Sequence, residues 1–418
     1  MPHDIAIPLP EQRPTRGGAS PLPKIDPASE GFTPVRSLYV HIPFCAHKCH
    51  YCDFYSIVDR QDRQEAFTTR LERELAAVAP WATEPLDTIF VGGGTPTLLA
   101  TNLWRRLLRT LDERFDLSHI NAGVGEFSVE CNPETATREL FDTLVAGGVN
   151  RISMGAQSFD PRHLKTLERW HDPQNVGRAA ELARTAGINR LSVDLIFAIP
   201  GQTLDEWRED MDRALALGTE HLSCYALTYE PGTAMTARLE RGEFERADHD
   251  LEADMYELCV SHLRAHGLAR YEVSNYARPG AECRHNLAYW RQEAWLACGP
   301  SASAHVAGWR WKNTPRLDDY LSGKSDFSPV VDVESPDPRR ALAEALMTGV
   351  RLAEGVPIET TLARARAIDP AIAERLGEIA GAWRGQGRLV ESGGRWVLTD
   401  LGVLVADRIA SDFIAGVA

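Results

Sequence analysis

Residues 45–52, CAHKCHYC, decide the fold of this 418-residue chain. A cube of four irons and four sulfides is normally closed by four thiolates, whereas this segment offers only three. One iron would keep an open coordination position, and an open position on a metal is where chemistry takes place. A CxxC pair alone is also typical of zinc or of a redox dithiol, but the CxxxCxxC spacing is narrower. It favours a [4Fe-4S] cluster held by Cys45, Cys49 and Cys52.

The composition is that of a globular protein, with 44% hydrophobic and 25% charged residues. The length is sufficient for one large domain and one small one. Lysine and arginine number 45 against 59 acidic residues, and the formal charge of −14 counts against a partner with a phosphate backbone, so we expect no nucleic-acid partner. Eight cysteines with three in one tight cluster do not suggest a disulfide framework, which predicts a reducing cytoplasm.

The first 34 residues are rich in proline and contain no apolar run. They are predicted to be a disordered lead-in, without the hydrophobic region of a signal peptide. No stretch of the chain approaches the ~20 apolar residues that span a bilayer. We therefore expect no transmembrane span, although peripheral contact with a membrane stays open.

From residue 35 onward, strand and helix patterns alternate. Strands are predicted at residues 37–42, 87–91, 126–130, 151–154, 190–197 and 221–225. Helical periodicity covers residues 64–78, 137–146, 175–186 and 204–216. Six strands with helical crossovers imply a parallel sheet, so the fold class is α/β with the sheet curled into a partial (β/α)6 barrel.

Unusual residues follow five of these strands in turn. The cysteine loop follows the first strand, a glycine run the second, and three further polar or proline-containing segments the next three, at residues 45–52, 92–97, 130–133, 155–159 and 200–203. In α/β barrels the carboxyl ends of the strands form the functional face. We therefore expect these five segments to converge on one rim.

Four segments carry a family resemblance: LYVHIPF at 38–44, GGGTPT at 92–97, RISMGAQSF at 151–159 and DLIFAIPGQT at 194–203. With the CxxxCxxC triplet they resemble the radical SAM superfamily, and within it the oxygen-independent coproporphyrinogen III oxidase family, from about residue 35 to the C-terminus. The resemblance implies that S-adenosylmethionine (SAM) chelates the fourth iron of the cluster. It also implies SAM contacts at Tyr39, Tyr51, Gly93, Gly94, Thr95, Glu130, Gln157, Arg169 and Asp194.

The residue types alone leave other roles open at these positions. Glu130 would by itself be a solvated loop carboxylate, and a glycine run is usually only a turn. Asp194 stands in an otherwise apolar strand, where it needs either a ligand or a structural partner such as Arg151 or Arg169.

Two features separate the chain from the decarboxylases of that family. The decarboxylases carry a further cysteine two residues after the third one, where this chain has Phe54. Their folded N-terminal segment has no counterpart in residues 1–34 of this chain. In both respects the chain resembles the heme-chaperone branch of the family. This resemblance implies that the chain binds heme and delivers it to a hemoprotein, and a respiratory enzyme is one candidate for that recipient. The alternatives are the oxidative decarboxylase itself, which would make the chain an enzyme, and a radical SAM methyltransferase.

Residues 285–290, HNLAYW, resemble the HNxxYW motif of the chaperone branch. His285 offers an imidazole ligand for heme iron, and Tyr289 and Trp290 offer flat apolar faces. In a helix His285 and Tyr289 would share one face. Core packing with a satisfied imidazole is the structural alternative. Cys283, Cys298 and His305 are weaker ligand candidates, whereas Cys131, Cys224 and Cys259 are expected to be buried as small hydrophobes.

The C-terminal segment has a different pattern. A helix over 339–352, a hairpin around the turn at 392–394 and a last helix from Thr399 or Asp400 to Ile414 predict a winged-helix-like α+β domain. The acidic charge favours an interaction or lid role over DNA binding. The predicted domains are the barrel at 35–265, a connecting region at 266–327 and this domain at 328–418. The oligomeric state stays open, a homodimer included.

Overall fold

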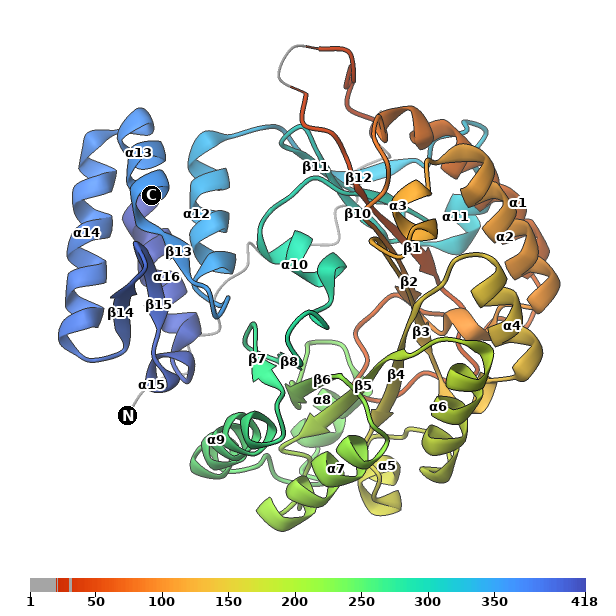
Figure 1. Ribbon diagram of the computed structural model, residues 1–418, viewed down its shortest axis with the longest axis horizontal. Helices are drawn as coiled ribbons and strands as arrows, with labels where there is room; N and C mark the ends of the chain where they lie inside the picture. The colour runs from red at the N-terminus through yellow and green to blue at the C-terminus, as the bar shows by residue number, and fades with distance from the viewer. Residues whose placement is uncertain (1–19, 21, 30–31) are drawn as a thin grey trace.

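The computed structural model describes Ser20, residues 22–29 and residues 32–418 of the chain. Most of the predicted lead-in at 1–34 lies outside the described residues. A large α/β unit and a smaller C-terminal unit lie side by side, with helix α10 between them (Figure 1). No helix among the described residues is long and apolar enough to cross a bilayer.

The large unit is built on a nine-stranded sheet in the order β7-β8-β6-β5-β4-β3-β2-β1-β9. Strands β1 to β6 are parallel and adjacent in chain order, as the sequence predicts for a partial barrel. Their bounds are β1 (Ser37–Ile42), β2 (Thr88–Gly93), β3 (Glu126–Cys131), β4 (Arg151–Gln157), β5 (Arg190–Phe197) and β6 (His221–Ala226). The six predicted strands are confirmed, with β4 ending three residues later than expected.

Three short strands that the sequence did not reveal extend the sheet at both edges. β9 (Leu296–Cys298) pairs in parallel with β1, and β8 (Asn275–Ala277) pairs antiparallel with β6 and with β7 (Ala269–Arg270). Strands of two or three residues are too short to show a periodicity. The region after β6 therefore completes the barrel wall rather than only connecting two domains.

Helices form a ring outside the sheet (Figure 1). Helices α1 and α7 have the predicted bounds, and α7 begins with a capping box in which Thr203 and Glu206 bond reciprocally. The elements of this layer are α1 (Gln64–Val78), η1 (Ala79–Trp81), η2 (Pro96–Leu98), α2 (Thr101–Arg114), α3 (Ser118–Asn121), η3 (Pro133–Thr135), α4 (Arg138–Ala146), α5 (Pro161–Thr166), α6 (Gln174–Ala186), α7 (Leu204–Ala216), α8 (Ala234–Glu240) and α9 (His249–Ala265).

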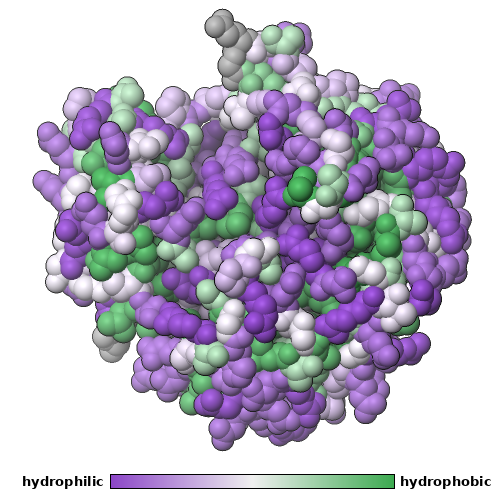
Figure 2. Space-filling model, in the orientation of Figure 1, coloured by the Kyte–Doolittle hydropathy of each residue, from purple (hydrophilic) through white to green (hydrophobic). Residues whose placement is uncertain are grey.

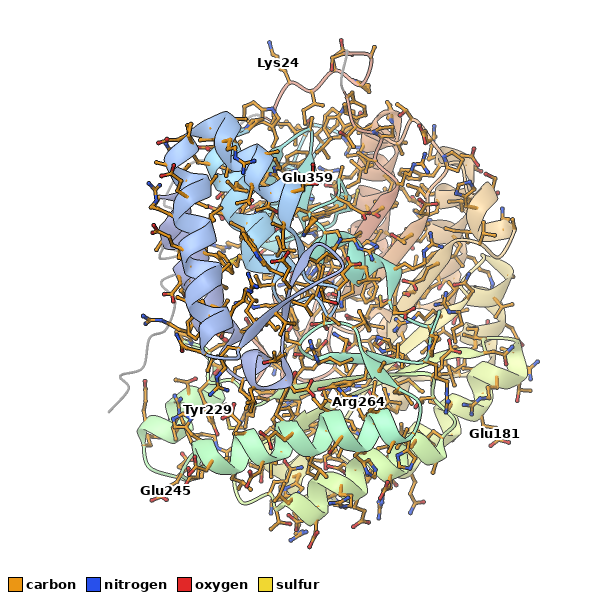
Figure 3. The ribbon with its side chains drawn as sticks, turned by 60° about the vertical axis from the view of Figure 1, so that its left-hand side comes forward. Lys24, Glu181, Tyr229, Glu245, Arg264 and Glu359 are labelled. Carbon is orange, nitrogen blue, oxygen red and sulfur yellow. The ribbon has the colours of Figure 1, made fainter. Side chains whose placement is uncertain are left out.

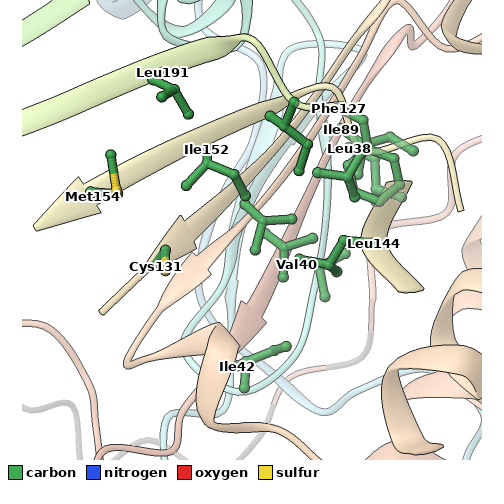
Figure 4. Packing of buried hydrophobic residues seen from close by; sticks show 14 of the residues in the cluster. Leu38, Val40, Ile42, Ile89, Phe127, Cys131, Leu144, Ile152, Met154 and Leu191 are labelled. Atoms are coloured by element: carbon green, nitrogen blue, oxygen red, sulfur yellow. The ribbon is translucent and has the colours of Figure 1, made fainter. Parts of the chain in front are cut away.

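Alternate residues of each strand point to opposite faces of the sheet. The outward face is apolar and fully buried beneath the helices, as with Leu38 and Val40 of β1 and Phe127 of β3 (Figure 4). The inward face is polar: Tyr39, His41, Ser128, Glu130, Arg151, Ser153, Ser192, Asp194, His221 and Ser223 occupy the alternate positions. The barrel thus has an apolar outside and a polar inside, so its inner face presents hydrogen-bonding and charged groups to the enclosed space.

The region between the barrel and the C-terminal unit contains a second sheet in the order β10-β11-β12. Its elements are α10 (Arg284–Trp290), β10 (Ser303–Val306), β11 (Trp309–Asn313), α11 (Leu317–Ser322) and β12 (Val330–Glu334). Trp311 of β11 packs edge-on against Trp81, with ring centroids 5.8 Å apart, so this sheet belongs to the core of the large unit.

The C-terminal unit has its own hydrophobic core, which includes Leu346, Leu376 and Phe413. Its elements are α12 (Pro338–Gly349), β13 (Val356–Pro357), α13 (Ile358–Ile368), α14 (Pro370–Gly385), β14 (Leu389–Ser392), β15 (Arg395–Leu398), α15 (Asp400–Val403) and α16 (Ala406–Val417). The helices and the β13-β15-β14 sheet form the winged-helix-like arrangement predicted from the sequence. Arg264 of α9, labelled in Figure 3, forms an ion pair with Asp400 and ties this unit to the barrel.

The predicted last helix is wrong in one respect, because two helices replace one. Thr399 caps α15 by accepting a hydrogen bond from Gly402 N, but the helix breaks at Val405, where φ is −124°. A side chain on Gly402 would approach the carbonyl oxygen of Arg388 to 1.9 Å. This close packing against the hairpin fixes the direction of α15, and α16 takes another.

The surface fits the composition. The face of the molecule in Figure 2 is mostly hydrophilic, and its hydrophobic residues occur in small patches. A small number of large hydrophobic side chains are exposed, among them Phe54 and Trp170 at 65% each, and both lie near the cysteine loop.

Candidate functional site

The cysteine loop leaves the end of β1 and returns to it. Cys45 N donates to Ile57 O and Ile57 N to Pro43 O, each at 2.8 Å, so the base of the loop is closed. Cys52 N donates to Cys49 O at 3.2 Å, which makes the second half a tight turn. These bonds fix the three cysteines on one compact loop above the barrel.

The three thiols fit an iron–sulfur cluster better than a single metal ion. All eight cysteines of the chain are free. Among the described residues, the groups of side chains whose ligand atoms lie within 4.8 Å of one another do not include these thiols. Their sulfur atoms are therefore spread more widely than one zinc ion requires, and a four-iron cube is wider than one ion. Arg169 Nη1 lies 3.8 Å from Cys49 Sγ and brings a cation to the loop.

The glycine run packs directly beneath the cysteine loop. A Cβ on Gly94 would lie 2.8 Å from the carbonyl oxygen of Phe44, and a Cβ on Gly93, whose φ is +111°, would lie 2.5 Å from the ring of His41. Side chains are excluded at both positions, at Gly94 by the backbone of the cysteine loop and at Gly93 by the ring of His41 in β1. Thr95 Oγ1 lies 3.5 Å from Cys45 Sγ, which joins the run to the cluster loop.

Glu130 and Asp194 are two half-buried carboxyls on the inward face of the sheet. Glu130 accepts a hydrogen bond from Gly93 N at 3.0 Å. Burial and then the charge of Asp194 raise the pKa of Glu130 to about 7. Burial also raises the pKa of Asp194, which accepts hydrogen bonds from Ser153 Oγ at 3.2 and 3.3 Å. The hydroxyls are the direct hydrogen-bond partners of Asp194, and the charges of Arg151 and Arg169 act on its carboxyl as well, opposing the rise of its pKa.

Gln157 is the last residue of β4, and Arg169 comes from the segment that follows α5. Gln157 has a φ of +65° at a bulge in the pairing of β4 with β5. Arg169 Nη2 donates to Gly155 O at 2.8 Å, while its Nη1 faces Cys49. Arg169 therefore joins the end of β4 to the cluster loop. Tyr51 packs against a small apolar cluster that includes Leu167 and Met235.

A chamber of about 620 Å³ lies inside the barrel. The predicted SAM residues Tyr39, Glu130 and Asp194 line it, and the predicted heme residues His285 and Tyr289 line it as well. The other predicted SAM residues do not line it: Tyr51 belongs to the cysteine loop, Gly94, Thr95 and Arg169 contact that loop, and Gly93 and Gln157 stand at the ends of β2 and β4. The chamber thus brings the two predicted ligand sites to one space.

His285 is buried with both ring nitrogens occupied. Nδ1 lies 2.8 Å from Thr88 Oγ1, and Nε2 lies 2.9 Å from the Tyr289 hydroxyl, which confirms the shared helix face. Burial lowers the pKa of His285 to about 4, so the ring is neutral near pH 7, the form that ligates metals. Trp290 lines a neighbouring cavity instead of the chamber.

The weaker ligand candidates have structural positions. Cys283 is buried beside Glu126 with Sγ 3.4 Å from the carboxylate, and Cys298 is buried in β9. His305 Nδ1 lies 3.1 Å from Glu293 O. Cys131, Cys224 and Cys259 are buried, as expected.

Comparison with known proteins identifies the family. Residues 39–214 match the Radical SAM superfamily and residues 337–405 the HemN C-terminal domain. Heme chaperone HemW of Mycobacterium tuberculosis is 39% identical over 381 residues, covering 89% of this chain and 93% of the relative. Heme chaperone HemW of Escherichia coli is 34% identical, covering 91% of this chain and 99% of the relative. The chain belongs to the HemW family.

A solved structure agrees with the fold of this HemW family member. Coproporphyrinogen III oxidase (HemN) of Escherichia coli, described as a radical SAM enzyme, superposes with a TM-score of 0.78 at 22% identity, covering 93% of this chain and 91% of that one. At this identity the likeness shows the fold alone. The α/β radical SAM fold with an additional C-terminal domain, as predicted from the sequence, is confirmed.

Sequence reasoning missed several polar residues of the chamber. His41, Arg151, His221 and Lys312 line it: His41 and Arg151 stand in motifs that carry the family resemblance but were not assigned to a ligand, and His221 and Lys312 stand in none. The signal for the first three was the alternation of polar and apolar residues in β1, β4 and β6, which was treated as a buried strand pattern. Lys312 had no local signal, because β11 reaches the chamber only through the tertiary fold.

Proposed function

We propose that this chain is a heme chaperone: it holds heme in the barrel chamber and delivers it to hemoproteins. We further propose that Cys45, Cys49 and Cys52 hold a [4Fe-4S] cluster whose fourth iron binds SAM. The observation that supports this most is the chamber itself, since residues predicted for SAM and residues predicted for heme line the same space. Similarity to the heme chaperone HemW of several bacteria supports the heme role.

The residues around the loop have definite tasks in this proposal. Arg169, held by Gly155 O, places a positive charge beside Cys49 and would stabilise thiolates there. Glu130, fixed by Gly93 N, would accept a hydrogen bond from the ammonium of SAM. When bound, the cluster and SAM supply one-electron chemistry.

Phe54 favours the chaperone over the decarboxylase. Its side chain is 65% exposed and lines the chamber, at the position where the decarboxylases that the chain resembles carry a further cysteine. The family members that carry out the alternative activity, oxidative decarboxylation of coproporphyrinogen III, have a thiol at this position, and this chain has none at Phe54. Incubation of the anaerobically reconstituted protein with SAM, a reductant and coproporphyrinogen III is expected to yield no protoporphyrinogen IX; its formation would overturn the proposal.

Heme titration tests the chaperone proposal directly. The cluster-loaded protein should bind one equivalent of heme per chain with a defined Soret band, and should lose it to an apo-hemoprotein. Binding that never saturates, or no Soret change at all, would reject the heme site.

The compartment and the partners complete the proposal. The free cysteines support a reducing cytoplasm, and the charge of −14 supports a protein recipient over a nucleic acid. A respiratory hemoprotein is the proposed recipient, reached through peripheral contact with its membrane. The oligomeric state is either a monomer or a homodimer, and analytical ultracentrifugation would distinguish the two.

His285→Ala and Tyr289→Phe are expected to act in opposite directions on heme binding. If His285 Nε2 ligates the iron, it must release the Tyr289 hydroxyl, which it contacts at 2.9 Å. Tyr289→Phe removes this competing bond and should tighten heme binding by about fivefold, the value of one ordinary hydrogen bond. His285→Ala should shift the Soret band and weaken binding. An unchanged spectrum in His285→Ala would exclude His285 as the ligand.

SAM affinity is expected to fall as the pH falls through the pKa of Glu130. Only the carboxylate form accepts a hydrogen bond from an ammonium, and burial together with Asp194 raises this pKa to about 7. Affinity measured calorimetrically should decrease by up to about tenfold per pH unit below this value. In Glu130→Gln the dependence should shrink to that of the SAM amine alone, whereas the exposed Glu139→Gln should retain it. A full pH dependence in Glu130→Gln would contradict the role of Glu130.

A further inference from the structure

Two cavities meet at one wall of the barrel. The chamber, about 620 Å³, and a cavity of about 580 Å³ that reaches Thr348 of α12 share part of their lining. The shared residues are Asn286, Tyr289, Trp295, Ser303 and Lys312. A ligand in the chamber therefore approaches the C-terminal unit across these five side chains.

Lys312 is the cation of this junction. It stands opposite Ser303 in the pairing of β10 with β11, and the alternation of β11 places it on the same face as Arg310. Arg310 is occupied by Glu344, with 2.7 Å between Nη1 and Oε1. Lys312 forms no ion pair with any carboxylate in the part of the chain that the structure describes. Its ammonium is therefore available to a ligand.

The electrostatics agree that this charge faces the chamber. The pKa of His41 is lowered to about 4, first by burial; the hydrogen bond with Tyr55 O opposes the shift, and the charge of Lys312 adds to it. His41 lies in β1 and lines the chamber, so the charge of Lys312 acts on a residue of the chamber wall. Three carboxyls line the chamber: Glu130 on β3, Asp194 on β5 and Asp53 in the loop after Cys52.

Flat apolar walls accompany the cation. Tyr289 and Trp295 pack edge-to-face with centroids 4.5 Å apart, and Trp295 packs in the same way against His305 at 5.1 Å. Aromatic faces beside one unpaired ammonium suit a planar, apolar ligand that carries a carboxylate at its edge. Heme has this chemistry, with propionates on one edge of the macrocycle.

We propose that Lys312 binds a propionate of heme at the junction of the two cavities, so that the propionate edge of the ligand is directed toward the C-terminal unit. This inference rests on the proposed heme binding. It assigns Lys312 as a binding residue that fixes the orientation of the ligand, separate from the iron ligand.

Two porphyrins and three variants test the assignment in the cluster-loaded full chain. Hemin carries free propionates, whereas hemin dimethyl ester has none, and dilute detergent keeps both monomeric. Lys312→Met should weaken hemin about tenfold to a hundredfold, the range for a hydrogen bond to a charged group, and leave the ester unchanged. Lys312→Arg should retain most of the hemin affinity. Lys324→Met, at an exposed lysine that lines neither cavity, is the matched control and should bind like the wild type.

The outcomes distinguish a failure of the Lys312 assignment from a failure of the proposed heme binding. If the wild type binds neither porphyrin, the proposed function fails. If the wild type binds hemin and Lys312→Met binds it equally well, or loses both porphyrins to the same extent, only the role of Lys312 is overturned. An unchanged Soret maximum in Lys312→Met would show that the iron ligand is intact, as the assignment requires.

Discussion

Replacing any one of Cys45, Cys49 and Cys52 by Ala is expected to remove the cluster completely. The base of the loop is closed by backbone bonds from Cys45 and Ile57, so the loop persists without the metal while the donor set falls to two thiolates. Two thiolates do not hold a four-iron cube. Iron and sulfide analysis of anaerobically reconstituted variants should show less than about a tenth of the wild-type content.

Cys259→Ala provides the matched control for these variants. Cys259 is fully buried in α9, away from the loop, and its replacement removes one thiol without touching the donor set. This variant should retain iron, sulfide and the visible absorbance of the cluster. Full occupancy in any of the three loop variants would contradict the assignment, as would zinc in place of iron in the wild type.

Much of the barrel could be predicted because its signals are local. The bounds of β1, α1, β5 and α7 follow from runs of apolar residues closed by strong stop or start signals, such as Pro43 after β1 and the Thr203 capping box. The convergence of the strand ends on one rim follows from the parallel order of the sheet.

The chamber could be predicted only in part. Asp194 is conspicuous as a carboxylate in an apolar strand, and Glu130 follows from its place at a strand end and from the family resemblance. Arg151 was considered only as a partner of Asp194, and His221 was not singled out. The wall formed by β9 and β11 could not be predicted, since β9 is a three-residue strand that pairs with the distant β1 and β11 belongs to a second sheet that reaches the chamber only through the tertiary fold. The sequence motif around His285 predicts a ligand candidate, but it does not predict that both ring nitrogens are hydrogen-bonded, because the partner of Nδ1 is Thr88 of the distant β2.

Glu74→Leu is expected to cause the largest loss of stability that does not touch the cluster. Glu74 of α1 is 2% exposed and accepts three hydrogen bonds: from Tyr320 Oη at 2.6 Å, from Asn313 Nδ2 at 2.7 Å and from Gly299 N at 2.9 Å. These partners come from α11, from β11 and from the turn after β9. The carboxylate of Glu74 therefore connects these three elements to α1 of the barrel.

Leucine has a similar volume but no acceptor. It would leave Tyr320 Oη and Gly299 N unpaired and would remove one of the two acceptors of Asn313 Nδ2, next to Arg70, which contacts the same cluster. Each unpaired buried donor costs about 1–3 kcal/mol, so the free energy of unfolding should fall by roughly 3–5 kcal/mol. Urea unfolding measures this, and hydrogen exchange should rise first in β9, β11 and α11. Glu65→Leu on the same helix, with Glu65 67% exposed, should cost less than about 0.5 kcal/mol.

The loss should reach the chamber as well as the fold. Asn313 is the neighbour of Lys312 in β11, and its side chain is held both by Glu74 and by Gly299 O at 2.9 Å. In Glu74→Leu the strand loses one of these two attachments, so the ammonium of Lys312 is no longer fixed at the junction of the cavities. Hemin affinity should then fall in Glu74→Leu but not in Glu65→Leu, at a temperature where both variants are folded. Equal hemin affinity in the two variants, with the expected difference in stability, would show that the wall does not position Lys312.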